Sequence, residues 1–215
     1  MWKPCYILLL GIAAVVGSSP SFGAQASEKG KSPYALALTE AKKDPGRADY
    51  GKLRELFTED SGYLPYVHLT PAYREHHPAL LAALESKDFK ATIKHAEAIL
   101  EVDYLDTEAH YFSSQAYEAL GNKKQAEYHR QFFDGVMDSI FSSGDGSSPQ
   151  TAIRVISLTE EWAVLSLLGY PRGGKHATKV HDGVKYDVLT GTHAETGKEA
   201  SFYFRPVDAF WKKAP

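Results

Sequence analysis

Histidines on predicted helices are the first side chains of this sequence that could do chemistry. His129 lies on an apolar helical face with Ala126 and Phe133, and His110 and His95 lie on neighbouring predicted helices. Neutral imidazole is a common ligand of zinc and copper, so three convergent histidines would suit such an ion. The spacings typical of histidine metal sites, H-x-H and H-E-x-x-H, are absent. We therefore favour hydrogen-bonded core histidines, assign no metal ligand, and keep a metal site as the alternative.

Asp145 lies between Gly144 and Gly146 in a segment rich in serine. A flexible turn of this kind can wrap oxygen ligands around calcium, but no second acidic residue falls within the turn. Its glycines could present backbone N–H groups to an anion, although no Gly-Lys-Ser follows as in a nucleotide phosphate loop. A tight turn in which Asp145 accepts local N–H bonds is the simpler interpretation.

Two adjacent carboxylates, Glu160 and Glu161, open a predicted helix. Acidic residues stabilise the positive end of a helix dipole, which accounts for them without catalysis. An acid–base pair must converge on one point, whereas consecutive helical side chains diverge by about 100 degrees. Asp187, after Tyr186 in a predicted hairpin, is a better single candidate, although an aspartate in a strand is more often a surface or cross-strand partner.

A serine nucleophile has weak support in this sequence. The G-x-S-x-G turn of many serine hydrolases is absent. Ser143, His129 and Asp145 are the residue types of a triad, but a glycine-rich linker is a poor support for a nucleophile. The remaining weak catalytic candidates are His110, His129, Asp145 and Asp187, and they define an alternative function. In that alternative, the chain is a metal-binding protein or a hydrolase-type enzyme with a His/Asp site between two structural parts.

The N-terminus has the pattern of an export signal. Lys3 is the only charged residue before an apolar run from Cys5 to Val16, which is shorter than the roughly 20 residues that span a membrane. Small residues follow, and Ala24-Gln25-Ala26 forms an A-x-A cleavage site. We therefore expect residues 1–26 to be a removed signal peptide and residues 27–32 a polar tether. The protein should be exported to the periplasm or secreted, with no stable membrane insertion after cleavage.

Composition narrows the class of protein further. The 215 residues are 43% hydrophobic and 24% charged with a formal net charge of −3, which suits a globular chain and gives no basic footprint for nucleic acid. The single cysteine, Cys5, lies in the predicted signal peptide. Thiol catalysis, disulfides and cysteine metal sites are thus excluded from the predicted mature chain.

Residues 33–141 have the periodicity of a helical region. Ser32 and Pro33 resemble an N-cap followed by proline at the first helical position. From residue 78 to 141, apolar residues recur every three or four positions and predict helices near 78–86, 89–102, 107–120 and 123–141. Shifting this segment by 34 residues places His95 on His129, and 34 residues is the period of tetratricopeptide repeats.

The remaining residues predict a small α+β region. Residues 142–150 contain no apolar residue and form a Gly/Ser linker turn. Within residues 151–215, β-branched residues near 152–158 predict a strand, and a helix capped by Thr159 follows. Runs at 183–190 and 200–205 form a predicted hairpin. The fold class is therefore α+β, a helical bundle followed by a β-α-β-β unit.

Two loosely matching copies, offset by 34 residues within residues 78–141, resemble tetratricopeptide repeats. Tyr117, Leu120, Gly121 and Ala126 stand where that repeat has an aromatic residue, a leucine, the inter-helix glycine and a small crossing residue. The resemblance implies a concave groove that binds an extended peptide. Its lining residues would then be Tyr111, Gln115 and Glu118.

A second resemblance covers nearly all of the predicted mature chain. The strings L-R-E-L-F-T, A-H-Y-F-S-S-Q-A-Y-E-A-L-G-N and S-S-G-D-G-S-S-P-Q-T-A resemble an exported bacterial family described only as domain of unknown function 4919. Trp162 and Arg205 stand where that family more often has tyrosine and asparagine. The resemblance implies the domain limits and export, and it implies no activity.

Taken together, the sequence favours an exported, non-catalytic binding module that uses a helical-repeat groove. We expect a protein or peptide partner in the cell envelope, no nucleic acid and no cofactor.

Overall fold

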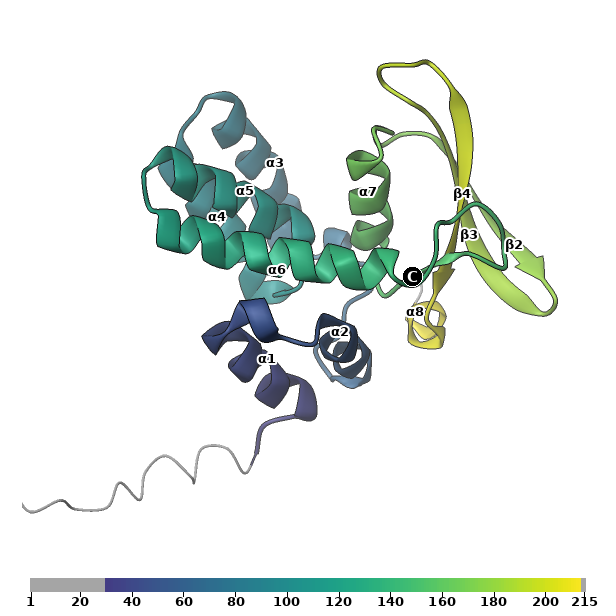
Figure 1. The fold of residues 1–215 in the computed structure, drawn as a ribbon, viewed down its shortest axis with the longest axis horizontal. Coiled ribbons are helices and arrows are strands. Elements are labelled where there is room, and N and C mark those ends of the chain that lie inside the picture. The colour runs from purple at the N-terminus through teal and green to yellow at the C-terminus, as the bar shows by residue number, and fades with distance from the viewer. Residues whose placement is uncertain (1–29, 214–215) are drawn as a thin grey trace, which may run out of the picture. The chain divides into compact units, whose positions relative to one another are not determined.

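A computed structural model of the protein describes residues 30–213. The predicted signal peptide and the first half of the predicted tether, residues 27–29, lie outside the described residues. Contacts group the chain into two units, Met1–Lys31 and Ser32–Pro215. Within the second unit the fold is α+β, with helices first and a four-stranded sheet near the C-terminus (Figure 1).

The chain enters the fold through two helices, α1 (Pro33–Lys43) and α2 (Tyr50–Glu59), with a short 3-10 turn η1 (Pro45–Arg47) between them. Ser32 caps α1 as the sequence predicts, because its Oγ accepts a hydrogen bond from the Ala35 N–H at 3.2 Å. A second 3-10 turn, η2 (Val67–Leu69), leads into the longer helices.

Two helix hairpins follow, α3 (Pro71–Glu85) with α4 (Phe89–Val102) and α5 (Thr107–Ala119) with α6 (Lys123–Phe141). Their second helices begin 34 positions apart, behind the cap residues Asp88 and Asn122. The turn residues Lys87 and Gly121 share a positive φ, 58° and 76°. The two hairpins therefore repeat one local geometry at the predicted offset, while their assignment to the tetratricopeptide type stays a prediction.

The helix α3 begins earlier than the predicted residue 78. Its N-cap is Thr70, whose Oγ1 accepts from the Tyr73 N–H at 3.2 Å, and Pro71 occupies the first turn. Pro78 lies inside the helix. Thr70-Pro71 thus supplies the start signal that the prediction placed at Pro78.

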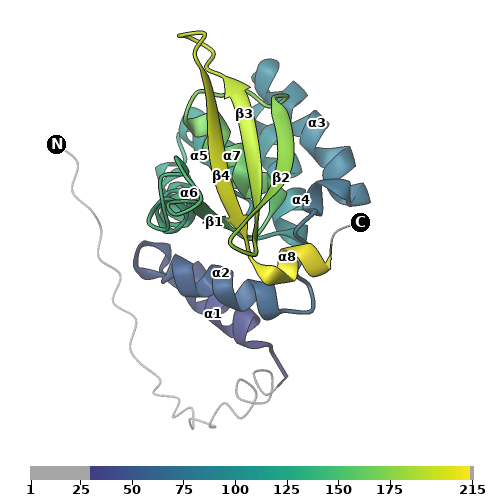
Figure 2. The same cartoon turned by 90° about the vertical axis from the view of Figure 1, so that its right-hand side faces the viewer.

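The sheet contains β1 (Ile153–Val155), β2 (Lys175–His181), β3 (Val184–Thr192) and β4 (Glu199–Pro206). Their spatial order is β1-β4-β3-β2, with β1 parallel to β4 and the other pairs antiparallel. The helix α7 (Leu158–Leu167) and the helix hairpins lie on one side of this sheet (Figures 1 and 2). A short helix, α8 (Asp208–Lys212), follows β4.

The edge strand β2 is absent from the predicted β-α-β-β unit and is found only in the structure. Every residue of this strand is exposed, and its sequence K-H-A-T-K-V-H is mostly polar. The hydrophobic alternation that predicts a strand is therefore missing, and β2 forms through its ladder with β3.

One core joins the helical and α+β parts of the chain. Phe57 of α2, Ile140 of α6, Val164 of α7 and Phe204 of β4 belong to the same buried cluster. A second cluster fills the space among α3, α4 and α5. The segment 142–150 is tied to the sheet, because the Gly146 carbonyl accepts from the Tyr203 N–H of β4 at 2.8 Å. Among residues 30–213, no helix is long and apolar enough to cross a membrane.

Candidate metal centre

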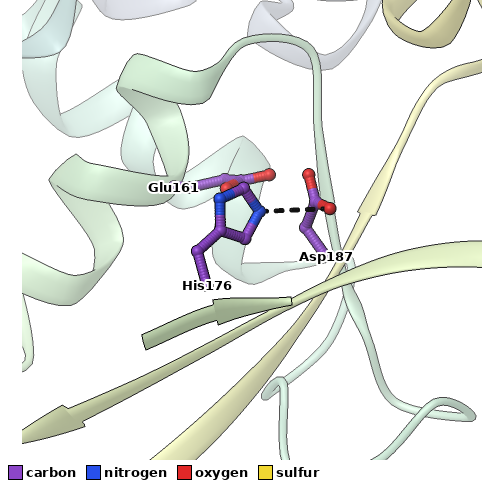
Figure 3. A group of neighbouring side chains, drawn as sticks. All are labelled: Glu161, His176 and Asp187. Atoms are coloured by element: carbon purple, nitrogen blue, oxygen red, sulfur yellow. Dashed lines mark ion pairs between the residues drawn. The ribbon is translucent and has the colours of Figure 1, made fainter. Parts of the chain in front are cut away.

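Strand register brings three potential ligands together where α7 covers the sheet. Asp187 of β3 pairs with Thr178 of β2, and His176 lies two residues before Thr178. Residues two apart on a strand share a face, so His176 and Thr178 both flank Asp187. Glu161 approaches this point from α7, and Figure 3 shows the three ligand side chains converging.

The distances within this trio are short. His176 Nε2 lies 3.2 Å from Asp187 Oδ1, and the Thr178 hydroxyl donates to the same oxygen at 2.9 Å. One ligand atom from each of Glu161, His176 and Asp187 lies within 4.8 Å of the others. Glu161 is 0% exposed and Asp187 2%, whereas the His176 side chain is 47% exposed. The trio is thus closed on the carboxylate side and open at the histidine.

Glu161 is the unusual member of the trio. Both of its carboxylate oxygens are buried without a hydrogen-bond partner. Burial raises its pKa well above the usual value, and the nearby charges of Asp187 and Glu160 raise it further. The same two carboxylates, Asp187 and Glu161, add to burial in raising the pKa of Tyr66. A carboxylate in this setting needs either a proton, which it would donate to Asp187, or a cation.

The neighbouring Glu160 has a different and structural role. It accepts two hydrogen bonds from Arg54, from Nε at 2.9 Å and from Nη2 at 2.8 Å. Its Oε2 also accepts from the Ile156 N–H at 2.8 Å. Ser157, rather than the predicted Thr159, caps α7 through a bond from the Glu160 N–H. As the helical rotation requires, Glu160 points to Arg54 whereas Glu161 points to His176 and Asp187.

The trio has the chemistry of a divalent transition-metal site. Imidazole nitrogen and carboxylate oxygen bind zinc at about 2.0–2.2 Å. Because the three ligand atoms already lie within 4.8 Å of one another, small side-chain adjustments would bring them onto one ion. Three protein ligands leave a coordination position for water, as in catalytic zinc sites. It is the one group of this kind among the described residues.

The predicted histidine site is divided into two pairs. His110 Nδ1 lies 2.9 Å from His129 Nδ1, whereas His95 pairs with His76 at 3.1 Å. The convergence of His95, His110 and His129 that the metal alternative required is therefore not found. Burial lowers the pKa of His110 to about 3 and that of His129 to about 4. His110 and His129 are therefore neutral and hydrogen-bonded to each other.

The Gly-Asp-Gly segment is a local turn. Asp145 is exposed, and its Oδ1 accepts from the Ser147 N–H at 2.9 Å. Hydrogen bonds from Thr151 and Ser147 lower its pKa to about 2. Ser143 donates to the Ile140 carbonyl and accepts from the Arg154 N–H. Neither Asp145 nor Ser143 contacts His129, so the structure does not assemble a triad from them.

The residues predicted to line a binding groove do lie together. Tyr111, Gln115 and Glu118 line one groove of about 910 Å³ between α5 and α6. Tyr111 is an exposed aromatic residue there, at 41%. Tyr117 instead stacks on His129, with ring centroids 5.5 Å apart.

Sequence reasoning named Asp187 but missed His176 and set Glu161 aside. Their convergence depends on the β2–β3 register and on α7 crossing the sheet, which are non-local. The alternating His176 and Thr178 were the available signal, because a strand there would place both on one face.

Comparison with known proteins gives a family. No curated protein and no solved structure matches this chain. The chain belongs to the family described as Domain of unknown function (DUF4919), whose model matches residues 52–210.

Proposed function

We propose that this protein is an exported protein that binds a divalent transition-metal ion, zinc first, through Glu161, His176 and Asp187. The observation that carries the proposal is Glu161, which is wholly buried, has no partner and faces a second buried carboxylate. A cation resolves both the repulsion between the carboxylates and the missing hydrogen bonds. The half-exposed His176 gives the ion a route from solvent.

The mixed ligand set selects the class of ion. Two carboxylates and one imidazole suit zinc, manganese or ferrous iron, whereas calcium prefers six to eight oxygen ligands. The open coordination position would be the place for water or a substrate. It is also where the hydrolase-type alternative would have its chemistry.

Calorimetric titration of the chelator-treated protein with Zn²⁺, Mn²⁺ and Ca²⁺ tests the proposal. We expect one zinc ion per chain, and we expect E161Q, D187N and H176Q each to weaken binding at least about tenfold. H181Q is the matched control, because His181 lies on the same strand outside the trio. Circular dichroism checks that each variant folds. Absence of zinc binding, or zinc binding that survives all three substitutions, would overturn the proposal.

A second candidate function is favoured by the groove that Tyr111, Gln115 and Glu118 line. It would bind an extended peptide of an envelope protein, with Tyr111 covering area at low entropy cost. A photo-crosslinking residue at position 115 tests this idea in the native envelope. Crosslinks to one protein that Y111A removes would support it, and crosslinks equal to those from position 85 on α3 would refute it.

A further inference from the structure

A cavity of about 710 Å³ lies beside α1, between this helix and residues of α4, α5 and α6. Its size is in the usual range for small-molecule sites. None of the three metal-site residues lines this cavity. His129, which is only 6% exposed, forms part of its wall.

Hydrogen bonding fixes the proton positions on the His110–His129 pair. His110 Nε2 must donate to the Tyr104 carbonyl at 2.9 Å, because a carbonyl only accepts. Neutral His110 therefore accepts at Nδ1, and His129 Nδ1 donates to it at 2.9 Å. Neutral His129 then carries a lone pair at Nε2, which has no protein partner in the described chain. An imidazole acceptor on the cavity wall is thus left for whatever enters the cavity.

Aromatic rings form much of the remaining wall. Tyr117 stacks on the His129 ring, and Tyr128 meets it edge-on at 5.3 Å. The hydroxyls of Tyr104 and Tyr128 lie 2.8 Å apart. The Lys42 ammonium lies 3.4 Å from the centroid of the Tyr104 ring. One face of the cavity therefore already holds a primary ammonium by a cation–π contact.

Carboxylates outnumber cations around the cavity. Glu97 and Glu101 lie one turn apart on α4, and Asp60 lies at the other side. Lys42 is the single lysine or arginine among the lining residues. Asp60 is bound by Ser32 and by the Gly62 N–H, but Glu97 receives only a long bond from Tyr117 at 3.3 Å. The cavity is rich in acceptors and negative charge.

We propose that this cavity binds a small protonated organic amine, with its N–H groups donating to His129 Nε2 and the Glu97 and Glu101 carboxylates, and its carbon chain against the tyrosine rings. This site is independent of the proposed metal centre. An uncharged polyol of the same length would fit the volume but would not neutralise the carboxylates.

The test compares 1,4-diaminobutane with 1,4-butanediol by calorimetry and by NMR of the tyrosine rings at pH 7.5. We expect the diamine to bind, the diol to bind at least about tenfold more weakly, and the shifts to concentrate on Tyr104, Tyr117 and Tyr128. Glu97 and Glu101 are exposed, so E97Q and E101Q should each weaken diamine binding roughly two- to fivefold. E85Q is the matched control, because Glu85 is exposed at the end of α3 and lies outside the cavity.

A second variant pair separates the two nitrogens of His129. Asparagine can place an N–H near Nδ1 but has no atom at Nε2, so H129N should keep the bond to His110 and lose diamine binding. Glutamine can restore an acceptor near Nε2, so H129Q should bind more tightly than H129N. Equal binding of diamine and diol would overturn the proposal. So would diamine binding unchanged in E97Q and E101Q, or no shift at millimolar diamine.

Discussion

The His110–His129 pair should make the protein lose stability when the pH falls from 7 to 5. The pKa of His129 is about 4 in the folded chain, against about 6.5 for an ordinary histidine. The unfolded chain therefore binds more protons between these two values. The stabilisation is complete above pH 6.5 and is lost as the pH falls toward 4. Integration between pH 7 and pH 5 gives about 2 kcal/mol for this one histidine.

Two buried aspartates change the stability with pH in the opposite direction. Their contribution must be cancelled by comparing two proteins that both contain them. Burial raises the pKa of Asp103 and Asp106 to about 7. The folded chain then binds more protons than the unfolded chain, so acidification stabilises it through these groups. Comparison of the native protein with H129N cancels this effect, because both aspartates remain. The substitution removes one titrating group and retains an N–H donor for His110.

Urea unfolding followed by tryptophan fluorescence at pH 7 and pH 5 measures the difference. We expect the stability advantage of the native protein over H129N to shrink by about 2 kcal/mol at pH 5. H181N is the control, because it replaces an exposed histidine of β2 that lies outside the His110–His129 pair. An equal difference between native protein and H129N at both pH values would refute the lowered pKa of His129.

Three further substitutions test the packing by urea unfolding. D106N should stabilise the protein by roughly 1–3 kcal/mol at pH 8 and by less at pH 5. It keeps the helix cap and removes a buried carboxylate, one oxygen of which (Oδ2) has no hydrogen-bond partner. A loss of stability at pH 8 would contradict this. R54M should cost about 3–5 kcal/mol, because it leaves Glu160 buried without its cation; a cost under about 1 kcal/mol would show that the pair is dispensable. G135A should cost about 1–3 kcal/mol of stability, because the new Cβ would overlap the Tyr50 ring. This cost should exceed the gain from the better helix propensity of alanine. A stabilised variant would show that the ring can move.

Helix boundaries were the most predictable part of the structure. The observed α4 and α6 have the bounds expected from the sequence, and α1 starts at the expected Pro33. Each starts at a capping side chain, Ser32, Asp88 or Asn122, and this signal is local. The α+β order followed from the change in composition after residue 141.

The candidate metal centre was less predictable, for a physical reason. Asp187 was identified from its residue type alone, whereas its partners come from β2 and α7. The polar strand β2 carries no hydrophobic alternation, so His176 had no predicted face. Glu161 opens a helix, as many surface glutamates do, and only the packing of α7 on the sheet buries it completely. Burial and strand register are non-local and cannot be obtained from spacing.

An ion bound by Glu161, His176 and Asp187 would also cross-link three separate elements of the chain, α7, β2 and β3. Cys5 is the only cysteine of the sequence and lies in the predicted signal peptide, so a disulfide is not available to the predicted mature chain. An ion held by Glu161 and Asp187 would close the loop between α7 and β3. Unlike a disulfide, such an ion would bind only the folded chain, so its binding free energy would add to the free energy of unfolding. His176 would add the edge strand to the same closure. A reversible, chelator-sensitive cross-link would then fasten the hairpin to the helix.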